Sequence, residues 1–213
     1  MIYSEEVALK VAEFLLQIKA IKLEPAKPFV WSSGWNSPIY CDNRVTLSFP
    51  TIRNYIRQKL SSAIEEKFGK PETIAGVATG GIAHGVLVAQ ELGVPFVYVR
   101  PESKKHGLGN QVEGHLVTTA GLVVVEDLVS TGKSSLAVVE ALRKQGCDVK
   151  HMVSIFDYGF PETEALFKKH KVELISLSDY HFLIKKALEL GYIKPDQMEV
   201  VLEWRKNPAE WGR

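Results

Sequence analysis

The sequence predicts an α/β fold of the doubly wound type, in which helices flank a mainly parallel sheet. Two observations favour this fold. Short apolar runs of the kind found in buried strands follow one another along the chain: TIAGVA, PFVYVR, LVVVE, VKHMVSIF and VELISL. Helical patterns alternate with these runs, at 82–92, 133–145, 161–170 and 179–190. Only the segment 100–118 breaks the alternation.

Two more helices are expected before the first of these strands. Ser4 can cap a helix whose apolar residues recur every three or four positions as far as Ile18, and Pro25 and Pro28 end it. A second amphipathic pattern predicts a helix from about Thr51 to Phe68. The segment FVWSSGWNSPIYCDNR between them is extended and rich in turns.

Composition limits the kinds of protein that this chain can be. With 213 residues, 46% hydrophobic, and no linker or repeat, residues 1–213 are expected to form a single domain. The net charge of +1 argues against a nucleic-acid partner. The two cysteines, Cys41 and Cys147, suggest neither a disulfide framework nor a zinc site, and a reducing compartment fits. No apolar run approaches the roughly 18 residues that span a bilayer, so we expect a soluble cytoplasmic protein without a membrane partner.

The stretch GLVVVEDLVSTGKSS at 121–135 ends like an ATP-binding P-loop. Gly132, Lys133 and Ser134 occupy the last three places of the pattern G-x-x-x-x-G-K-[ST], but its first glycine is replaced by Asp127, preceded by Glu126. Two carboxylates at this place would repel a triphosphate. The pattern therefore argues against a triphosphate site.

The same stretch suits a smaller ligand. Ligands of such sheets bind at the carboxyl ends of the strands, and the turn leads directly into a helix whose amino end attracts phosphate. Four hydroxyls can join the backbone amides around one phosphate: those of Ser130, Thr131, Ser134 and Ser135. The neighbouring carboxylates match the vicinal diol of a ribose, so ribose 5-phosphate fits. The alternative is a capped helix after a buried strand that ends in two solvated acids.

Basic residues gather in VRPESKKHGLGNQVEG at 99–114. Arg100, Lys104, Lys105 and His106 lie in a glycine-rich stretch with no apolar face, which indicates a long mobile loop. Such a loop could close over an anionic leaving group. The alternative is a solvated surface loop.

A second strand-to-helix turn is expected in VATGGIAHG at 77–85. Gly80 and Gly81 would let backbone amides approach an anion, although tight-turn chemistry explains the pair equally well. We expect His84 to face inward from the following helix rather than to act in catalysis.

These segments together resemble the type I phosphoribosyltransferases, which bind 5-phosphoribosyl 1-diphosphate, and within them the enzymes that act on orotate. The most specific parts of the match are WSSGWNSPIYCDNR at 31–44, RPESKKHGLGNQVEG at 100–114, EDLVSTGKS at 126–134 and EWRKNP at 203–208. The resemblance implies the type I fold with a mobile catalytic loop and a hood over the base site, built from residues 1–45 and the carboxyl-terminal tail. It also implies transfer of the phosphoribosyl group to orotate in pyrimidine biosynthesis, Mg²⁺ held mainly by substrate rather than by a protein metal site, and a homodimer whose loops are shared between subunits.

The resemblance also assigns residues to roles. The catalytic residues would be Lys104, His106, Glu126 and Asp127. The phosphoribosyl diphosphate would be bound by Arg100, Lys104, His106, Thr79, Gly80, Gly81 and the run Glu126, Asp127, Leu128, Val129, Ser130, Thr131, Gly132, Lys133 and Ser134. The orotate would contact Ser130, Tyr40, Cys41 and Tyr158.

The chain departs from many relatives at four positions where they carry basic residues, namely Ser32, Gly80, Pro101 and Tyr158. The orotate carboxylate would then need another partner, either the backbone amides around Ser33 and Gly34 or the side chain of Lys27.

Two other functions stay open at this stage: a phosphoribosyltransferase for another base, and a regulatory protein that binds the diphosphate ligand without turnover. The segment WSSGWNSPIYCDNR argues against the first, and the presence of Lys104 and His106 argues against the second.

Overall fold

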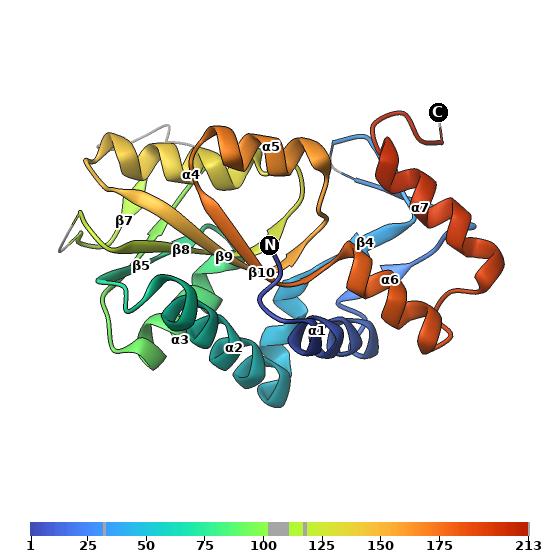
Figure 1. Ribbon diagram of the computed structural model, residues 1–213, viewed down its shortest axis with the longest axis horizontal. Helices are drawn as coiled ribbons and strands as arrows, with labels where there is room; N and C mark the ends of the chain where they lie inside the picture. The colour runs from blue at the N-terminus through green and yellow to red at the C-terminus, as the bar shows by residue number, and fades with distance from the viewer. Residues whose placement is uncertain (32, 102–110, 117–118, 213) are drawn as a thin grey trace.

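The computed structural model describes residues 1–31, 33–101, 111–116 and 119–212. Within these residues, six strands form one sheet in the order β10-β9-β8-β5-β6-β7 (Figure 1). Neighbouring strands are parallel except β6 and β7, which are antiparallel, so the predicted mainly parallel sheet is confirmed. The strands are β5 (Thr73–Val77), β6 (Phe96–Val99), β7 (Val112–Glu113), β8 (Leu122–Val129), β9 (Val149–Asp157) and β10 (Glu173–Asp179).

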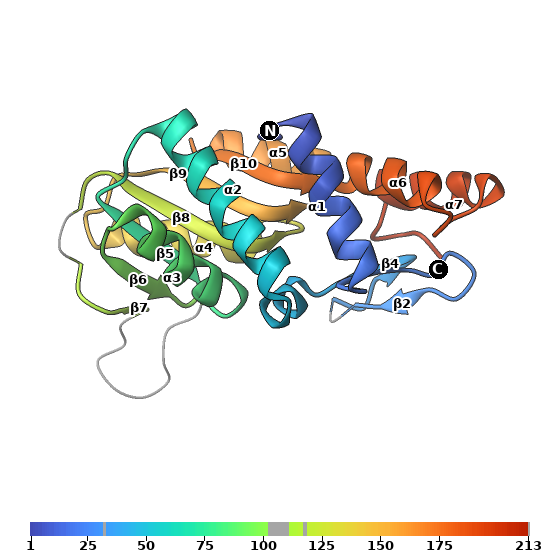
Figure 2. The same cartoon turned by 90° about the horizontal axis from the view of Figure 1, so that it is seen from below.

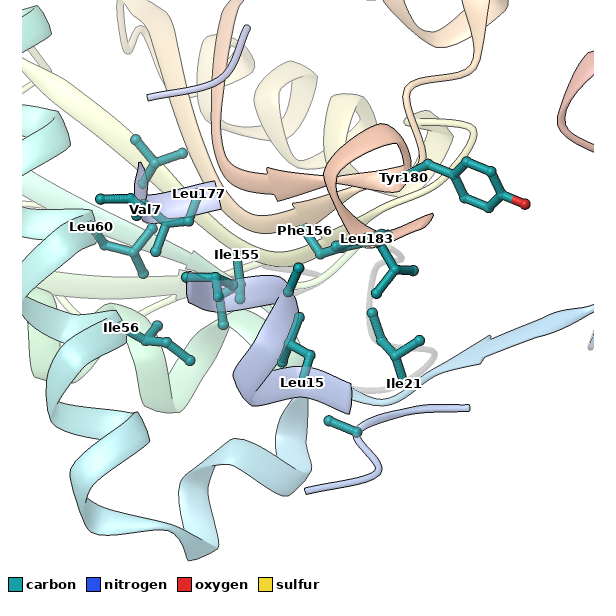
Figure 3. Packing of buried hydrophobic residues seen from close by; sticks show 14 of the residues in the cluster. Val7, Leu15, Ile21, Ile56, Leu60, Ile155, Phe156, Leu177, Tyr180 and Leu183 are labelled. Atoms are coloured by element: carbon teal, nitrogen blue, oxygen red, sulfur yellow. The ribbon is translucent and has the colours of Figure 1, made fainter. Parts of the chain in front are cut away.

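Helices cover both faces of this sheet (Figure 1). On one face lie α1 (Glu5–Gln17), α2 (Pro50–Phe68) and α3 (Gly80–Leu92), and on the other lie α4 (Lys133–Lys144) and α5 (Pro161–Lys169). Because successive strand residues point to opposite faces, β8 sends Val123 and Val125 into one core and Leu122 and Val124 into the other. Figure 3 shows part of the first core, where side chains of α1 and α2 meet those of β9 and β10.

Two element boundaries differ from the sequence prediction, and both differences affect the residues of interest. Strand β8 continues past the predicted run LVVVE to Val129, because it stays paired with β9 up to the Val129–Asp157 pair, so Asp127 lies inside the strand as Glu126 does. Helix α3 begins at Gly80, so the glycine pair forms the first turn of the helix. The predicted cap is confirmed, since Ser4 Oγ accepts a hydrogen bond from Val7 N.

The strand order places the end of β5 next to the end of β8. After β5 the chain moves to β6 and β7 on one side, and it then returns to pair β8 on the other side of β5. In a doubly wound sheet this reversal leaves a crevice outside the carboxyl ends of the two strands. The segments that follow β5 and those that end β8 therefore face the same crevice.

Segments from the two ends of the chain pack together beside the sheet (Figures 1 and 2). The strand β1 (Ile21–Leu23) pairs with β4 (Ile39–Cys41), and β2 (Phe29–Val30) pairs with β3 (Asn36–Ser37). A 3-10 helix, η1 (Asn43–Ser48), leads from β4 toward α2. After β10 come α6 (Tyr180–Glu189), the 3-10 helix η2 (Pro195–Gln197) and α7 (Met198–Lys206).

A buried tryptophan holds these segments to each other. Trp204 on α7 is fully buried, and its Nε1 donates to Asn36 O at 3.0 Å. Its ring packs edge-on against Trp31, with 5.5 Å between the ring centroids. The contact agrees with a hood formed from both ends of the chain, whose function stays a prediction.

None of the described helices is long and apolar enough to span a membrane.

Candidate active site

Two cavities lie at the crevice, and Cys41 and Leu128 line both of them. The first, which we call the polar cavity, has a volume of about 360 Å³ and is lined by Cys41, Asp42, Arg44, Val77, Ala78, Thr79, Gly80, Glu126, Asp127, Leu128 and Ser134. The second, which we call the aromatic cavity, has a volume of about 680 Å³ and is lined by Val30, Trp31, Ser33, Trp35, Tyr40, Cys41, Leu128, Ser130, Thr131, Lys133 and Tyr158. A further cavity of about 740 Å³ beside α5 and β10 contains none of the predicted site residues.

Asp127 and the start of α3 lie in close contact. A Cβ atom added to Gly80 would lie 2.2 Å from Asp127 Cγ, so only glycine leaves room for this carboxylate. Gly81 is equally constrained, because a Cβ there would lie 2.4 Å from the backbone oxygen of Val125. The glycine pair thus lets the amino end of α3 approach β8, and it brings the carboxylate to the wall of the polar cavity.

The two acids of β8 both line the polar cavity but have different further contacts. Glu126 turns toward α4 and is only 4% exposed. Its Oε2 accepts from Ser135 Oγ at 2.9 Å, and its Oε1 accepts from Asp127 N at 3.0 Å. Burial, followed by the charge of Asp127, raises the pKa of Glu126 well above its ordinary value. Burial therefore favours the protonated form of Glu126.

Ser135 is a correction to the sequence analysis. Its hydroxyl, expected to join the phosphate cradle, is buried and donates to Glu126 instead. The exposed positions at this helix end are Lys133 and Ser134. Their side chains and the backbone amides of the first turn of α4 remain available to an anion.

Contacts with α5 fix the turn between β8 and α4. Gly132 has a left-handed φ of 74°, and a Cβ there would lie 2.7 Å from the Phe167 ring. Thr163 Oγ1 donates to Ser130 O at 2.6 Å. Gly132 and the fully buried Val129 thus shape the turn, while Ser130, Thr131 and Lys133 line the aromatic cavity.

Tyr158 and Trp31 form the floor of the aromatic cavity. Their ring centroids are 5.0 Å apart, and Trp31 Nε1 donates to Ile39 O at 3.0 Å. Burial raises the pKa of the Tyr158 phenol well above its ordinary value, so this group stays neutral. Arg205 on α7 donates to Tyr158 O at 3.3 Å and to Gly159 O at 2.6 Å. The supporting roles of Trp204 and Arg205, which belong to the EWRKNP segment, are not apparent from sequence spacing.

The structure places one predicted residue away from these cavities and leaves four others undescribed. Arg100 lies outside the described lining of both, where its guanidinium forms an ion pair of 2.6 Å with Glu113 across the β6–β7 pair. Lys104, Lys105, His106 and Ser32 fall outside the described residues.

His84 faces inward, as the sequence predicted. The side chain is buried, and burial lowers its pKa to about 4, so the imidazole is neutral near neutral pH. Its Nε2 lies 3.3 Å from Thr46 Oγ1, which ties α3 to the 3-10 helix after β4.

Comparisons with known proteins identify the family of this chain. A family profile described as "Phosphoribosyl transferase domain" matches residues 48–187. The orotate phosphoribosyltransferase of Phocaeicola vulgatus is 54% identical over 200 residues, which cover 94% of each chain, and that of Cytophaga hutchinsonii is 50% identical over 99% of each chain. The chain belongs to the orotate phosphoribosyltransferase family.

Solved structures show the same fold for members of this family. The orotate phosphoribosyltransferase of Aeropyrum pernix superposes with a TM-score of 0.74 at 30% identity, covering 86% of this chain and 99% of that one. The UMP synthase of Leishmania donovani has a TM-score of 0.77 at 22% identity, covering 93% of this chain and 42% of that one. The second similarity concerns the fold alone.

The first two glycines of α3 give a first testable prediction. An alanine at Gly80 would meet the side chain of Asp127, whereas an alanine at Gly81 would meet the backbone of Val125. Gly80→Ala should displace the Asp127 carboxylate and lower turnover at least tenfold with little loss of stability, since a side chain can rotate away. Gly81→Ala presses on the Val125 carbonyl, which cannot move without β8, and should cost about 2 kcal/mol or more of unfolding free energy.

Steady-state kinetics and urea unfolding of both variants would check this pair. Gly93→Ala is not a suitable control, because Gly93 has a left-handed φ of 64°. Val86→Ala is suitable, because Val86 lies exposed on the same helix. A Gly80→Ala variant with wild-type turnover would contradict the close approach of Asp127.

Proposed function

We propose that this chain transfers the 5-phosphoribosyl group from 5-phospho-α-D-ribose 1-diphosphate to orotate, giving orotidine 5′-phosphate and diphosphate. The observation that carries the proposal is the junction of the two cavities at Cys41 and Leu128, beside Asp127. A flat heterocycle fits the aromatic cavity, and a sugar diphosphate fits the polar one. The names of the relatives described above support orotate as the base.

The aromatic cavity would hold orotate. Trp31 and Trp35 offer ring faces to a pyrimidine, and the cavity is also lined by Tyr40, Cys41 and the almost fully buried Tyr158. Lys133 is the one lysine or arginine among the described residues that line this cavity, so it is the strongest candidate to balance a carboxylate or phosphate there. Ser33 also lines the cavity, whereas Lys27 and Gly34 are outside its described lining.

The sugar would lie where the cavities meet. Its 5′-phosphate would accept hydrogen bonds from the backbone amides and hydroxyls of the Ser130–Ser134 turn at the amino end of α4. Asp127 would accept hydrogen bonds from the ribose hydroxyls and would place negative charge near the sugar as the bond to diphosphate breaks. Glu126 would hold Asp127 in place through its contact with the Asp127 amide.

The diphosphate would lie in the polar cavity against Thr79 and Gly80 at the amino end of α3. Among the described residues no three His, Cys, Asp or Glu side chains form a metal cluster. Asp42 and Asp127 do line the cavity, and Mg²⁺ commonly takes one or two carboxylates together with substrate phosphates and water. When bound, Mg²⁺ would neutralise charge on the leaving group.

The basic loop would complete the site from a second subunit. Lys104 and His106 would contact the departing diphosphate, and either could protonate it, while Arg100 would approach it at the base of the loop. Support comes from the absence of Arg100 from the described lining of both cavities, its ion pair with Glu113, and the family pattern of a shared loop. A twofold dimer would then have two sites, each built from both chains.

The direct test of the proposed function is turnover of orotate with phosphoribosyl diphosphate and Mg²⁺, followed by the loss of orotate absorbance. Uracil and adenine in place of orotate serve as controls. Orotidine 5′-phosphate should also raise the melting temperature more than ATP does, because only a ligand that binds the native state stabilises it. Turnover of another base, with none of orotate, would overturn the proposal.

The shared loop predicts complementation between two inactive variants. Lys104→Ala and Asp127→Asn homodimers should each be defective. In a mixed dimer, one site takes its loop from the Asp127→Asn chain and its acid from the Lys104→Ala chain, so that site carries neither substitution. Random pairing makes about half of the dimers mixed, so roughly a quarter of wild-type activity should return. Activity that stays at the level of the parents, with subunit exchange confirmed by mass spectrometry, would reject the shared loop.

A further inference from the structure

Asn43 is a buried polar residue that connects the two cavities without lining either of them. It lies at the start of η1, directly after β4, and is 0% exposed. Its side-chain Nδ2 donates to the backbone oxygen of Asp127 at 2.6 Å, a contact between residues 84 positions apart. Its Oδ1 accepts from the Cys41 thiol at 3.3 Å. The side-chain amide of Asn43 thus contacts two residues: Cys41, which lines both cavities, and Asp127, which lines the polar cavity.

The chemistry of these partners sets the orientation of the Asn43 amide. A backbone carbonyl can only accept, so the NH₂ group must face Asp127. The carbonyl oxygen of the side chain is then left for the thiol, which can donate to it. The Asn43 side chain therefore fits this place in one orientation, and an aspartate of the same size would set a carboxylate against the Asp127 carbonyl.

The backbone of Asn43 is fixed as well. Its carbonyl oxygen accepts from Thr46 Oγ1 at 2.6 Å, and that hydroxyl lies 3.3 Å from His84 Nε2 on α3. Three walls of the crevice meet at this residue: the strand β4 that carries Cys41, the end of β8, and helix α3, whose first residue is Gly80. Hydrogen bonds on both the side chain and the backbone of Asn43 restrict the movement of these walls relative to one another.

We infer that Asn43 is a positioning residue that fixes the aromatic cavity relative to the polar cavity. The inference rests on the proposed function, in which the base nitrogen in one cavity attacks the sugar carbon in the other. Displacement of a reacting group by about 1 Å can lower a rate by roughly a hundredfold. A residue that holds Cys41 and Asp127 together controls this distance even though it touches no substrate.

This role has a distinctive signature in ligand binding. Orotidine 5′-phosphate spans both cavities, so its affinity depends on how they are placed relative to each other. Phosphoribosyl diphosphate also reaches the turn residues Ser130, Thr131 and Lys133 at the edge of the aromatic cavity, but it places no ring against Trp31, Tyr158 and Cys41. Loss of Asn43 should therefore weaken the nucleotide more than the diphosphate, whereas general destabilisation would weaken both alike.

The experiment compares Asn43→Asp and Asn43→Ala with wild type, using Asn54→Ala on the exposed face of α2 as the matched control. Calorimetry would give Kd for orotidine 5′-phosphate and for phosphoribosyl diphosphate with Mg²⁺, and kinetics would give kcat with orotate. We expect Asn43→Asp to lower kcat and weaken the nucleotide at least tenfold, with Kd for the diphosphate within about threefold. Asn54→Ala should match wild type in all three measurements.

The outcomes separate the inference from the proposed function. If wild type does not turn over orotate, the proposed function fails, whatever Asn43 does. If wild type is active and Asn43→Asp changes kcat and both Kd values by less than threefold, or weakens both ligands equally, the positioning role is rejected. If circular dichroism shows that Asn43→Asp does not fold, Asn43→Ala replaces it, because alanine removes the donor without adding a carboxylate. The same limits on kcat and on the two Kd values then apply.

Discussion

Asp127→Asn is expected to lower kcat/KM by roughly a hundredfold or more while leaving the fold unchanged. The side chain lies against the amino end of α3 at the wall of the polar cavity, where asparagine has the same shape and lacks the charge. Because the developing positive charge on the sugar needs a nearby anion, removal of that anion should act on the transition state rather than on folding. Steady-state kinetics, with circular dichroism to confirm the fold, measure the effect.

Asp148→Asn is the matched control, since Asp148 is exposed and forms its ion pair with Lys150 on the surface. Its kcat/KM should equal that of wild type. A loss of less than about threefold in Asp127→Asn, or roughly 0.6 kcal/mol, would remove Asp127 from the proposed role.

The same residue sets the acid limb of the pH profile. Burial raises the pKa of Asp127 above its ordinary 3.8. The ionised form is the one required, so kcat/KM should fall as the pH drops through this raised value, and the midpoint should lie above that of an exposed aspartate. The limb should change or disappear in Asp127→Asn.

Trp204→Ala is expected to destabilise the protein by about 3–5 kcal/mol. The indole is 0% exposed and lies within a ring cluster, with centroid distances of 5.5 Å to Trp31, 5.8 Å to Tyr158 and 5.5 Å to Tyr180. Its removal leaves a cavity between the two ends of the chain and leaves the Asn36 carbonyl without its donor. Urea unfolding and the melting temperature measure the loss.

Trp204→Phe helps to separate the two contributions, because it keeps an aromatic ring but removes the N–H donor and the five-membered part of the indole, which leaves a smaller cavity than alanine does. Its cost should be about 1–2 kcal/mol. Since Trp204 packs on Tyr158 and Trp31 beneath the aromatic cavity, the alanine variant should also raise KM for orotate. A stability change below 1 kcal/mol in Trp204→Ala would show that the two ends of the chain are not joined through this side chain.

The sequence alone predicted much of this protein. Alternation of apolar runs with helical patterns gave the sheet, because buried parallel strands and amphipathic helices have distinct periods. The stretch VVVEDLVSTGKSS indicated a phosphate site joined to acids, because a helix start with hydroxyls and glycine suits a phosphate. The family resemblance in WSSGWNSPIYCDNR agrees with the relatives named above.

Other features depend on tertiary structure, because they join residues far apart in sequence or set the direction of a side chain. Spacing could not show that Glu126 contacts Ser135 on α4 while Asp127 lies against Gly80, since the predicted strand LVVVE ends at Glu126 and these partners belong to other elements. The contacts of Asn43 with Asp127 and of Trp204 with Trp31 bring together segments with no common local pattern. Local periodicity determines which elements form, whereas the packing of those elements decides which side chains meet at the site.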